Sequence, residues 1–144
     1  MSLLVVDASV VLKWFVPEIH SEAARRLLQG DHHYFAPDLL FAEIANAIWK
    51  KVVRGELSWS DGKKLASDIE SVAVETVPCR VLATDACALA IATRRSAYDA
   101  MYLALAVRLK TQMVTADEKL ARALAGSPIA APYIQTVQQA SIAI

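Results

Sequence analysis

Four acidic side chains lie in or beside strongly apolar segments, at four separate places along the chain. They are Asp7 in VVDAS, Glu43 in LLFAEIANAI, Asp99 in AYDAMYLALA and Asp117 in VTADEKL. An ionised carboxylate in such surroundings is costly unless it has a partner. If the fold gathers the four, each pair about 6 Å apart would repel by roughly 3 kcal/mol at an effective dielectric of about 20. Such a cluster requires raised pKa values or a hard divalent cation, whose preferred ligands are carboxylate oxygens and water.

Purely structural roles also explain three of these acids. Asp7 precedes an expected helix and can cap it, and Asp117 is either an acid in the first turn of another helix or its cap, because aspartate favours both positions. Asp99 lies three residues after Ser96, the spacing of a capping box. Glu43 falls in the second turn of an expected helix, where capping cannot explain it. The residues alone therefore leave both the metal site and the structural reading open.

Composition narrows the class of protein. The chain has 144 residues and is 56% hydrophobic, which excludes disorder and predicts a single domain over residues 1–144. Lys plus Arg and Asp plus Glu both number 15, so the net charge argues neither for nor against a nucleic-acid partner. Cys79 and Cys87 lack the spacing of a zinc site or a disulfide framework, which favours a cytoplasmic protein with reduced thiols. No uncharged apolar stretch is long enough to span a membrane.

Apolar runs alternate with helical periodicity along the chain. Strands are expected at 3–6, 32–37, 74–77, 112–116 and, less clearly, 133–137. Helices are expected at 8–16, 21–28 with Ser21 as cap, 38–54, 60–72, 82–93, 97–109 with Ser96 as cap, and 117–126. This order predicts a three-layer α/β/α sandwich with a central, mainly parallel sheet of four to five strands. In such sheets ligands bind at the carboxyl ends of strands, where Asp7 and Asp117 lie.

Four segments taken together resemble a known family. VVDASV, PDLLFAEIANAI, YDAMYLALA and VTADEKL, in this order and at these intervals, are similar to the PIN-domain ribonucleases, and most of all to the VapC toxins of toxin–antitoxin pairs. The resemblance covers essentially the whole chain. The YDA-x-YLALA and T-x-D-x-x-L segments are its most specific parts, whereas a lone D-x-S after a strand would be weak.

The resemblance implies a role for each acid. In this family four acids gather at the carboxyl edge of the sheet and hold Mg²⁺ or Mn²⁺. Carried over to this chain, Asp7 and Asp99 are the principal metal ligands, and Asp117 binds directly or through water. Glu43 orients or deprotonates the attacking water. All four are therefore the expected catalytic residues.

Neighbouring residues fit the same pattern. Ser9 matches the family's small polar residue beside the first acid, and Thr115 matches the hydroxyl that precedes the last one. Leu120 departs from the aromatic residue of many relatives, which affects packing only. Arg94 and Arg95 precede the helix of the third acid, and we expect them to contact RNA phosphates.

The implied function is a Mg²⁺-dependent endoribonuclease toxin that acts on RNA, forms a homodimer and is inhibited by a small antitoxin. Two alternatives remain open: a PIN-fold RNA-processing nuclease without an antitoxin, and a non-catalytic RNA-binding module, against which the four retained acids argue. Trp14, Phe15, Trp49 and Trp59 offer more aromatic surface than their elements need. They predict an apolar groove beside the acids for an antitoxin tail, unless they belong to the core.

Overall fold

A fully parallel sheet forms the centre of the protein. The computed structural model describes residues 1–142 and contains five strands in the order β3-β2-β1-β4-β5. The strands are β1 (Ser2–Val6), β2 (His32–Pro37), β3 (Val74–Val77), β4 (Met113–Thr115) and β5 (Ile134–Thr136). Every neighbouring pair is parallel. The predicted sheet is confirmed, including the less clearly expected last strand.

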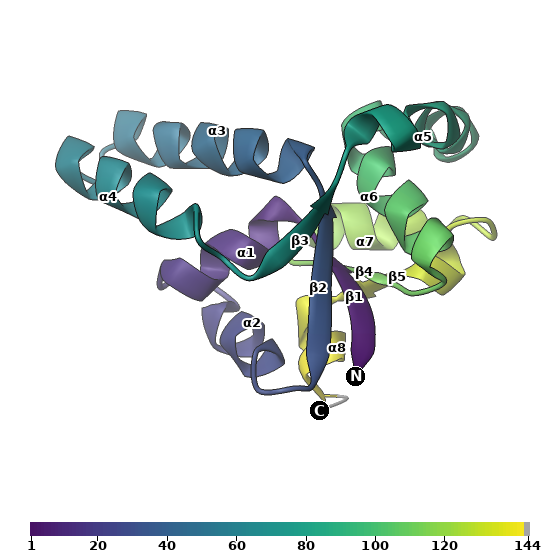
Figure 1. The fold of residues 1–144 in the computed structure, drawn as a ribbon, viewed down its shortest axis with the longest axis horizontal. Helices are drawn as coiled ribbons and strands as arrows, with labels where there is room; N and C mark the ends of the chain where they lie inside the picture. Colours follow the sequence, from purple (N-terminus) through teal and green to yellow (C-terminus); the bar gives the residue numbers. More distant parts are fainter. Residues whose placement is uncertain (143–144) are drawn as a thin grey trace.

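Helices cover both faces of this sheet, as the predicted three-layer sandwich requires. They are α1 (Ala8–Phe15), α2 (Ser21–Leu27), α3 (Leu39–Val53), α4 (Trp59–Ile69), α5 (Cys79–Thr93), α6 (Ala97–Leu109), α7 (Glu118–Ala125) and α8 (Val137–Ile142), with a short 3₁₀ turn η1 (Ala131–Tyr133). Helices α1, α2 and α8 pack together, whereas α6 packs on β1, β2 and β4 and carries α5 on its outer side. The α3–α4 hairpin projects from the end of β2 as an arm (Figure 1). No helix within residues 1–142 is long and apolar enough to cross a membrane.

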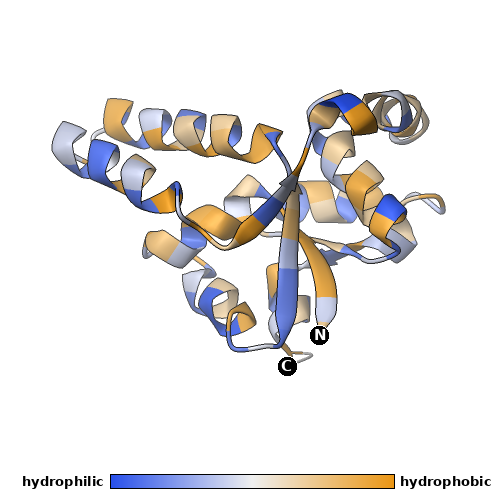
Figure 2. Ribbon diagram, in the orientation of Figure 1, coloured by the Kyte–Doolittle hydropathy of each residue, from blue (hydrophilic) through white to orange (hydrophobic). Residues whose placement is uncertain are grey.

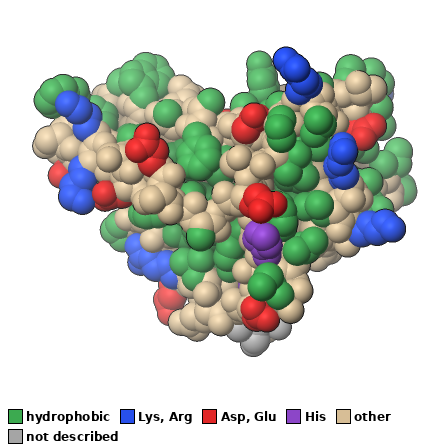
Figure 3. Space-filling view, in the orientation of Figure 1, with side chains coloured by type: hydrophobic (Ala, Val, Ile, Leu, Met, Phe, Trp, Pro, Cys, Tyr) green, Lys and Arg blue, Asp and Glu red, His purple; other side chains and the backbone are tan. Residues whose placement is uncertain are grey.

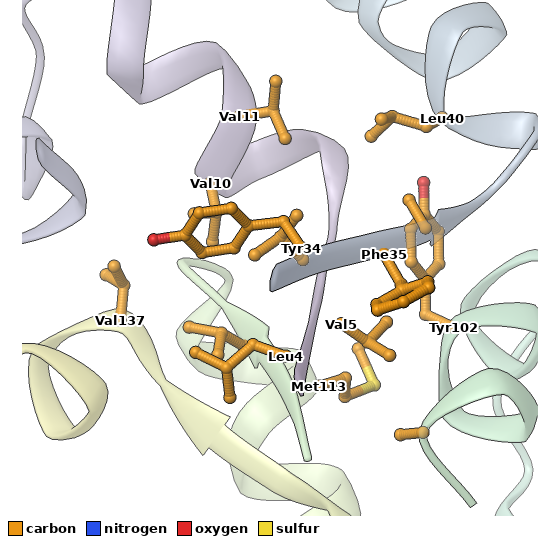
Figure 4. Close-up of a cluster of buried hydrophobic side chains, with 14 of the residues drawn as sticks. Leu4, Val5, Val10, Val11, Tyr34, Phe35, Leu40, Tyr102, Met113 and Val137 are labelled. Atoms are coloured by element: carbon orange, nitrogen blue, oxygen red, sulfur yellow. The ribbon is translucent and has the colours of Figure 1, made fainter. Parts of the chain in front are cut away.

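Residues that pair across strands pack on the same face of the sheet. Leu4 pairs with Tyr34 and faces α1, whereas Val5 pairs with Phe35 and Met113 and faces α6 (Figure 4). This alternation follows from the two-residue period of a strand. Both faces are therefore buried, which explains the continuous apolar run of β1. Hydropathy changes along β2, which is hydrophilic at its start and hydrophobic toward its end (Figure 2).

The strand order reverses between β1 and β4. From β1 the chain moves to β2 and β3 on one side, and β4 then returns to the other side of β1 and continues to β5. The connections leaving the carboxyl ends of β1 and β4 consequently diverge to opposite faces and open a crevice between them. Asp7 follows β1 and Asp117 lies two residues beyond β4, so two of the four acids are placed at this crevice.

Two helix starts differ from the prediction. Ser21 is the first residue of α2, and the cap position belongs to His20, whose φ is 65°. The Ser21 hydroxyl instead donates to the carbonyl of Val16 at 2.6 Å, which fastens the loop after α1. Helix α4 begins at Trp59, because the Ser58 hydroxyl accepts the N–H three residues later at 3.1 Å.

Helix α5 begins three residues earlier than expected. Its first N–H, from Cys79, donates to Oδ1 of Asp38 at 3.0 Å, so the cap comes from a residue 41 positions away. Hydrogen bonding to this N–H also holds the pKa of the Asp38 carboxyl below its ordinary value. A cap at this distance leaves no local signal. The short helix α8 was not predicted either, and Val137, expected at the end of the last strand, is its first residue.

Candidate active site

All four sequence-predicted acids line one cleft. It encloses about 680 Å³ at the crevice between β1 and β4 and also extends along α3. One end of the lining carries Asp7, Glu43, Asp99 and Asp117. The α3 part continues through Ala47 to Lys50, Lys51 and Arg54, with Glu18 and Glu56 beside them. Glu43 comes from α3 and Asp99 from α6. A notch in the upper outline of Figure 3 separates the α3–α4 arm from the lobe that α5 and α6 form. The four acids come from four different elements, so only the tertiary fold brings them together.

Asp7 is held by hydrogen bonds on both carboxylate oxygens. Oδ1 accepts from the Ser9 hydroxyl at 2.5 Å and from the Val10 N–H at 3.2 Å, which makes Asp7 the cap of α1. Oδ2 accepts from the Thr115 hydroxyl at the end of β4. An ionised carboxylate offers about four acceptor positions, so Oδ2 keeps one free. Capping and a metal-binding role are therefore compatible.

The two hydroxyls also join the ends of β1 and β4. Thr115 accepts the Asp117 N–H at 3.1 Å, and Ser9 accepts the Ala116 N–H at 3.0 Å. Because these backbone groups only donate, the proton of each hydroxyl remains available and goes to Asp7. The predicted auxiliary residues Ser9 and Thr115 thus position the Asp7 carboxylate.

Burial makes the charge on Asp7 costly. Only 8% of the residue is exposed. Burial raises the pKa of Asp7 to about 6, although the hydrogen bonds from Ser9, Thr115 and Val10 lower it; the nearby charge of Glu43 raises it further. The structure gives Asp7 no cationic side chain within ion-pair distance among residues 1–142. A bound cation would therefore stabilise its ionised form.

Glu43 has a partner that sequence reasoning missed. The buried Tyr102 hydroxyl donates to Oε1 of Glu43 at 2.6 Å and thereby links α6 to α3. Burial raises the pKa of Glu43, the hydrogen bond from Tyr102 opposes that rise, and the charge of Asp99 adds to it. A signal was present, because Tyr102 lies three residues after Asp99 on the same helix face, and a buried tyrosine hydroxyl usually needs a partner.

Asp99 is ion-paired to a residue that we expected to contact RNA. Nη2 of Arg95 lies 3.3 Å from Oδ2 of Asp99, and both side chains are about one-third exposed. The Ser96 hydroxyl accepts the Asp99 N–H at 3.1 Å, which confirms the predicted cap of α6. Arg94 ends α5 with φ 59° and is exposed. Neither arginine is part of the cleft lining among the described residues.

Asp117 is the most exposed of the four acids. Its Oδ1 accepts the Leu120 N–H at 3.1 Å, so it caps α7, which was one of the two roles expected for it. Its exposure leaves room for water between the carboxylate and a bound ion.

The donor set suits a hydrated divalent cation. Within residues 1–142, no three Asp, Glu, His or Cys side chains converge closely enough to form a ready-made metal site. Mg²⁺, however, retains several waters and needs only one or two direct carboxylates. The carboxylates present are hard oxygen donors, and burial raises the pKa of both Asp7 and Glu43. The residues therefore fit Mg²⁺ or Mn²⁺ held partly through water.

The opposite end of the cleft is weakly basic, because its lining has three cations, Lys50, Lys51 and Arg54, and two carboxylates, Glu18 and Glu56. Glu18 accepts Lys51 Nζ at 2.7 Å and Lys13 Nζ at 3.0 Å, and the Lys13 side chain is only 9% exposed. Burial acts against ionisation of Glu18, but the hydrogen bonds from Lys51 and Lys13 prevail and lower its pKa. Lys50 and Arg54 are exposed at the end of α3.

The predicted aromatic groove is not beside the acids. The Trp14 ring packs edge-on against Tyr34, and its Nε1–H donates to the carbonyl of Ala24 at 2.8 Å. Trp49 and Trp59 lie on the α3–α4 arm and are 59% and 70% exposed. None of the tryptophans belongs to the lining of the acidic cleft within the described chain. The expectation that they form its apolar wall was wrong, because they lie on other faces of their helices.

Comparison with known proteins agrees with this arrangement. Residues 4–124 match the PIN domain family. A protein named Ribonuclease VapC3 from Pyrobaculum aerophilum is 33% identical over 120 residues, which cover 82% of this chain and 92% of that protein. Ribonuclease VapC9 from Mycobacterium tuberculosis is 32% identical over 118 residues, covering 82% and 88% of the two chains.

A solved structure shares the fold. The crystal structure of PAE2754 from Pyrobaculum aerophilum superposes with a TM-score of 0.71 at 17% identity, over 99% of this chain and 88% of that one. At that identity the likeness concerns the fold alone. Together with the match over residues 4–124 and the relatives above, it leads to one assignment: the chain belongs to the PIN-domain family and is VapC-like.

Proposed function

We propose that the protein is a Mg²⁺-dependent endoribonuclease that hydrolyses RNA phosphodiester bonds and acts as the toxin of a toxin–antitoxin pair. The observation that carries the proposal is the cleft lined by all four acids at the reversal of strand order. The curated relatives, which are named VapC ribonucleases, support the same chemistry.

Each acid has a distinct place in the proposed reaction. Asp7 and Asp99 are the principal ligands of the cation, and Asp117 binds it directly or through water. A bound Mg²⁺ or Mn²⁺ supplies Lewis-acid stabilisation of the phosphoryl oxygens and acidifies its water. Ser9 and Thr115 keep the Asp7 carboxylate in one orientation through their hydrogen bonds.

Glu43 orients or deprotonates the attacking water. A raised pKa suits a general base, because efficient bases titrate near the working pH. Tyr102 fixes the carboxylate by its hydrogen bond at 2.6 Å, so the base has a defined orientation before RNA binds.

Substitution of Asp99 tests the nuclease. Asp99→Asn removes one ligand charge, and we expect RNA cleavage to fall at least 100-fold while the fold is kept. Asp85→Asn is the matched control, because Asp85 is exposed on α5 and does not line the cleft. Both variants are purified in parallel and assayed with and without EDTA. Cleavage by Asp99→Asn at the wild-type rate would refute the assignment.

The proposed partners need separate tests. A small antitoxin should copurify when the reading frame beside the gene is co-expressed, and its absence would favour an RNA-processing nuclease. We also propose a homodimer, because large apolar side chains are exposed on α3 and α5, namely Trp49, Val53, Val81 and Ile91. Sedimentation should give twice the 15.7 kDa mass of the chain, and a monomer at micromolar concentration would contradict the dimer.

A further inference from the structure

The cleft has an acidic end and a basic end. Its acidic end carries Asp7, Glu43, Asp99 and Asp117, which repel a phosphodiester unless a cation is bound. Its other end, along the last turns of α3, has three cations (Lys50, Lys51 and Arg54) and two carboxylates (Glu18 and Glu56), so it is basic by one net charge. An RNA strand that enters this cleft is therefore attracted at one end before the acids are neutralised at the other.

Helix α3 connects the two ends as a continuous wall. Glu43, Ala47, Lys50 and Arg54 recur at intervals of three or four residues and all line the cleft. From Glu43 to Arg54 the helix rises by about 16 Å. This length corresponds to a few nucleotides of an extended strand, so the cations lie well away from the bond to be cut.

The cations at this end differ in whether an acidic side chain already pairs with them. Lys51 is paired with Glu18 at 2.7 Å and lies 4.0 Å from Glu56, and Glu18 also holds Lys13. Lys50 and Arg54 are exposed, and within residues 1–142 the structure pairs neither with an acidic side chain. The two residues without an acidic partner are therefore the ones available to an incoming phosphate.

We propose that Lys50 and Arg54 form a phosphate-binding subsite that holds the RNA backbone on one side of the cleavage point. Glu18 limits the strength of this subsite, because it keeps the charge of Lys51 engaged within the protein. The inference rests on the proposed function, since it takes RNA as the ligand. It also gives the bound strand a fixed path, which runs from the acids along α3.

Cations at the end of a helix also have a simpler explanation. Lys50 and Arg54 lie at the C-terminus of α3, where positive charge stabilises the helix dipole. That role does not require them to line a cleft together with the acids. Arg122, in the last turn of α7, supplies the matched control, because it is exposed, without an ion pair among the described residues, and outside this cleft.

Salt-dependent binding tests the subsite without cleavage. A fluorescein-labelled single-stranded RNA of 12 nucleotides is titrated in EDTA at 50–200 mM NaCl, and anisotropy gives the affinity. Each phosphate contact on a single strand contributes about 0.7 to the slope of log affinity against log salt. The double variant Lys50→Gln/Arg54→Gln should reduce the slope by about 1.4. The advantage of the wild type should therefore shrink about sevenfold between 50 and 200 mM salt.

A variant that should bind RNA more tightly provides the second test. Glu18→Gln removes a negative charge and releases Lys51, so binding should tighten and the slope should rise by up to about 0.7. A glutamine oxygen still accepts from the buried Lys13, which preserves that hydrogen bond. A structural role for the network alone predicts no such gain.

The outcomes separate the alternatives. The proposal holds if the double variant loses slope, Glu18→Gln gains it and Arg122→Gln changes neither. It is overturned if Arg122→Gln has the same effect as the double variant or if the slope is unchanged. It is also overturned if the double variant loses affinity for a polyglutamate peptide but not for RNA, since the surface would then receive an acidic protein segment. Each single variant is tested as well, in case the double variant unfolds.

Because binding is measured in EDTA, the result does not depend on catalysis. If Asp99→Asn loses cleavage but Lys50→Gln/Arg54→Gln keeps the wild-type salt slope, the subsite alone is refuted. Conversely, if the wild type never cleaves RNA but the double variant loses slope as expected, the nuclease is refuted and the RNA subsite is not.

Discussion

Replacing Asp7 with asparagine should stabilise the metal-free protein at neutral and alkaline pH. Asparagine has the same shape, and its oxygen can accept from Ser9 and Val10 as the aspartate does. Its amide group can donate to the Thr115 oxygen, which then reverses its role. The substitution therefore removes a buried charge, keeps the hydrogen bonds from Ser9 and Val10, and reverses the one with Thr115.

The pKa of Asp7 gives the size and sign of this effect. The carboxyl titrates at about 6 in the fold and at 3.8 in the unfolded chain. Between these values the folded protein keeps a proton that the unfolded chain has released, so stability falls as the pH rises through that window. The loss is complete above pH 6 and amounts to about 3 kcal/mol. Asp7→Asn escapes it, which corresponds to a gain in Tm on the order of 10 °C at pH 8.

Thermal or urea unfolding in EDTA from pH 4 to 8 measures this difference. The curves of wild type and Asp7→Asn should nearly coincide at pH 4 and separate as the pH rises to 7. Mg²⁺ at about 100 times its Kd should then restore about 2.7 kcal/mol to the wild type, with little effect on the variant. Asp85→Asn serves as the control for a lost surface charge. If the stability of wild type and Asp7→Asn changes in parallel over the whole pH range, Asp7 does not have the raised pKa of a buried carboxylate.

Three further substitutions probe neighbouring features. Tyr102→Phe removes the donor to Glu43, so the acid limb of the pH–rate profile should move to higher pH and cleavage should fall roughly tenfold, which pH-dependent kinetics would detect. Arg95→Gln removes a cation that competes for Asp99, so calorimetry should show tighter Mg²⁺ binding; weaker binding would contradict this role. Ser58→Ala removes the cap of α4 and should lower the free energy of unfolding by about 1 kcal/mol while leaving cleavage unchanged.

Local features of the fold could be predicted because their causes lie within a few residues. The apolar run of β1 and the Ser96 cap of α6 depend on periodicity and on a side chain three residues from its partner. The cap of α5 could not be predicted, since Asp38 reaches Cys79 across 41 residues. Ser21 was misassigned for a different reason: its contact is local, but its hydroxyl binds the carbonyl of Val16 in the preceding loop and does not cap the helix.

For the candidate site, the acids could be identified but not their surroundings. The family pattern pointed to Asp7 and Glu43, and both line the cleft. The bond between Tyr102 and Glu43 joins residues 59 positions apart, and the pairing of Lys51 with Glu18 joins residues 33 apart. Such contacts depend on how α3 packs against the rest of the protein, which no local pattern encodes.

The bond between Asp7 and Thr115 also bears on the order of events during synthesis. The two residues are separated by 108 positions, and β1 gains its neighbour β4 only when the later segment has left the ribosome. At about 5–20 residues per second, that interval lasts roughly 5–20 s. During it the Asp7 carboxylate lacks one of its two hydroxyl donors, and the edge of β1 that will receive β4 is unpaired and open to aggregation. A nascent chain of this topology is thus most in need of a chaperone or partner until its fourth strand joins the sheet.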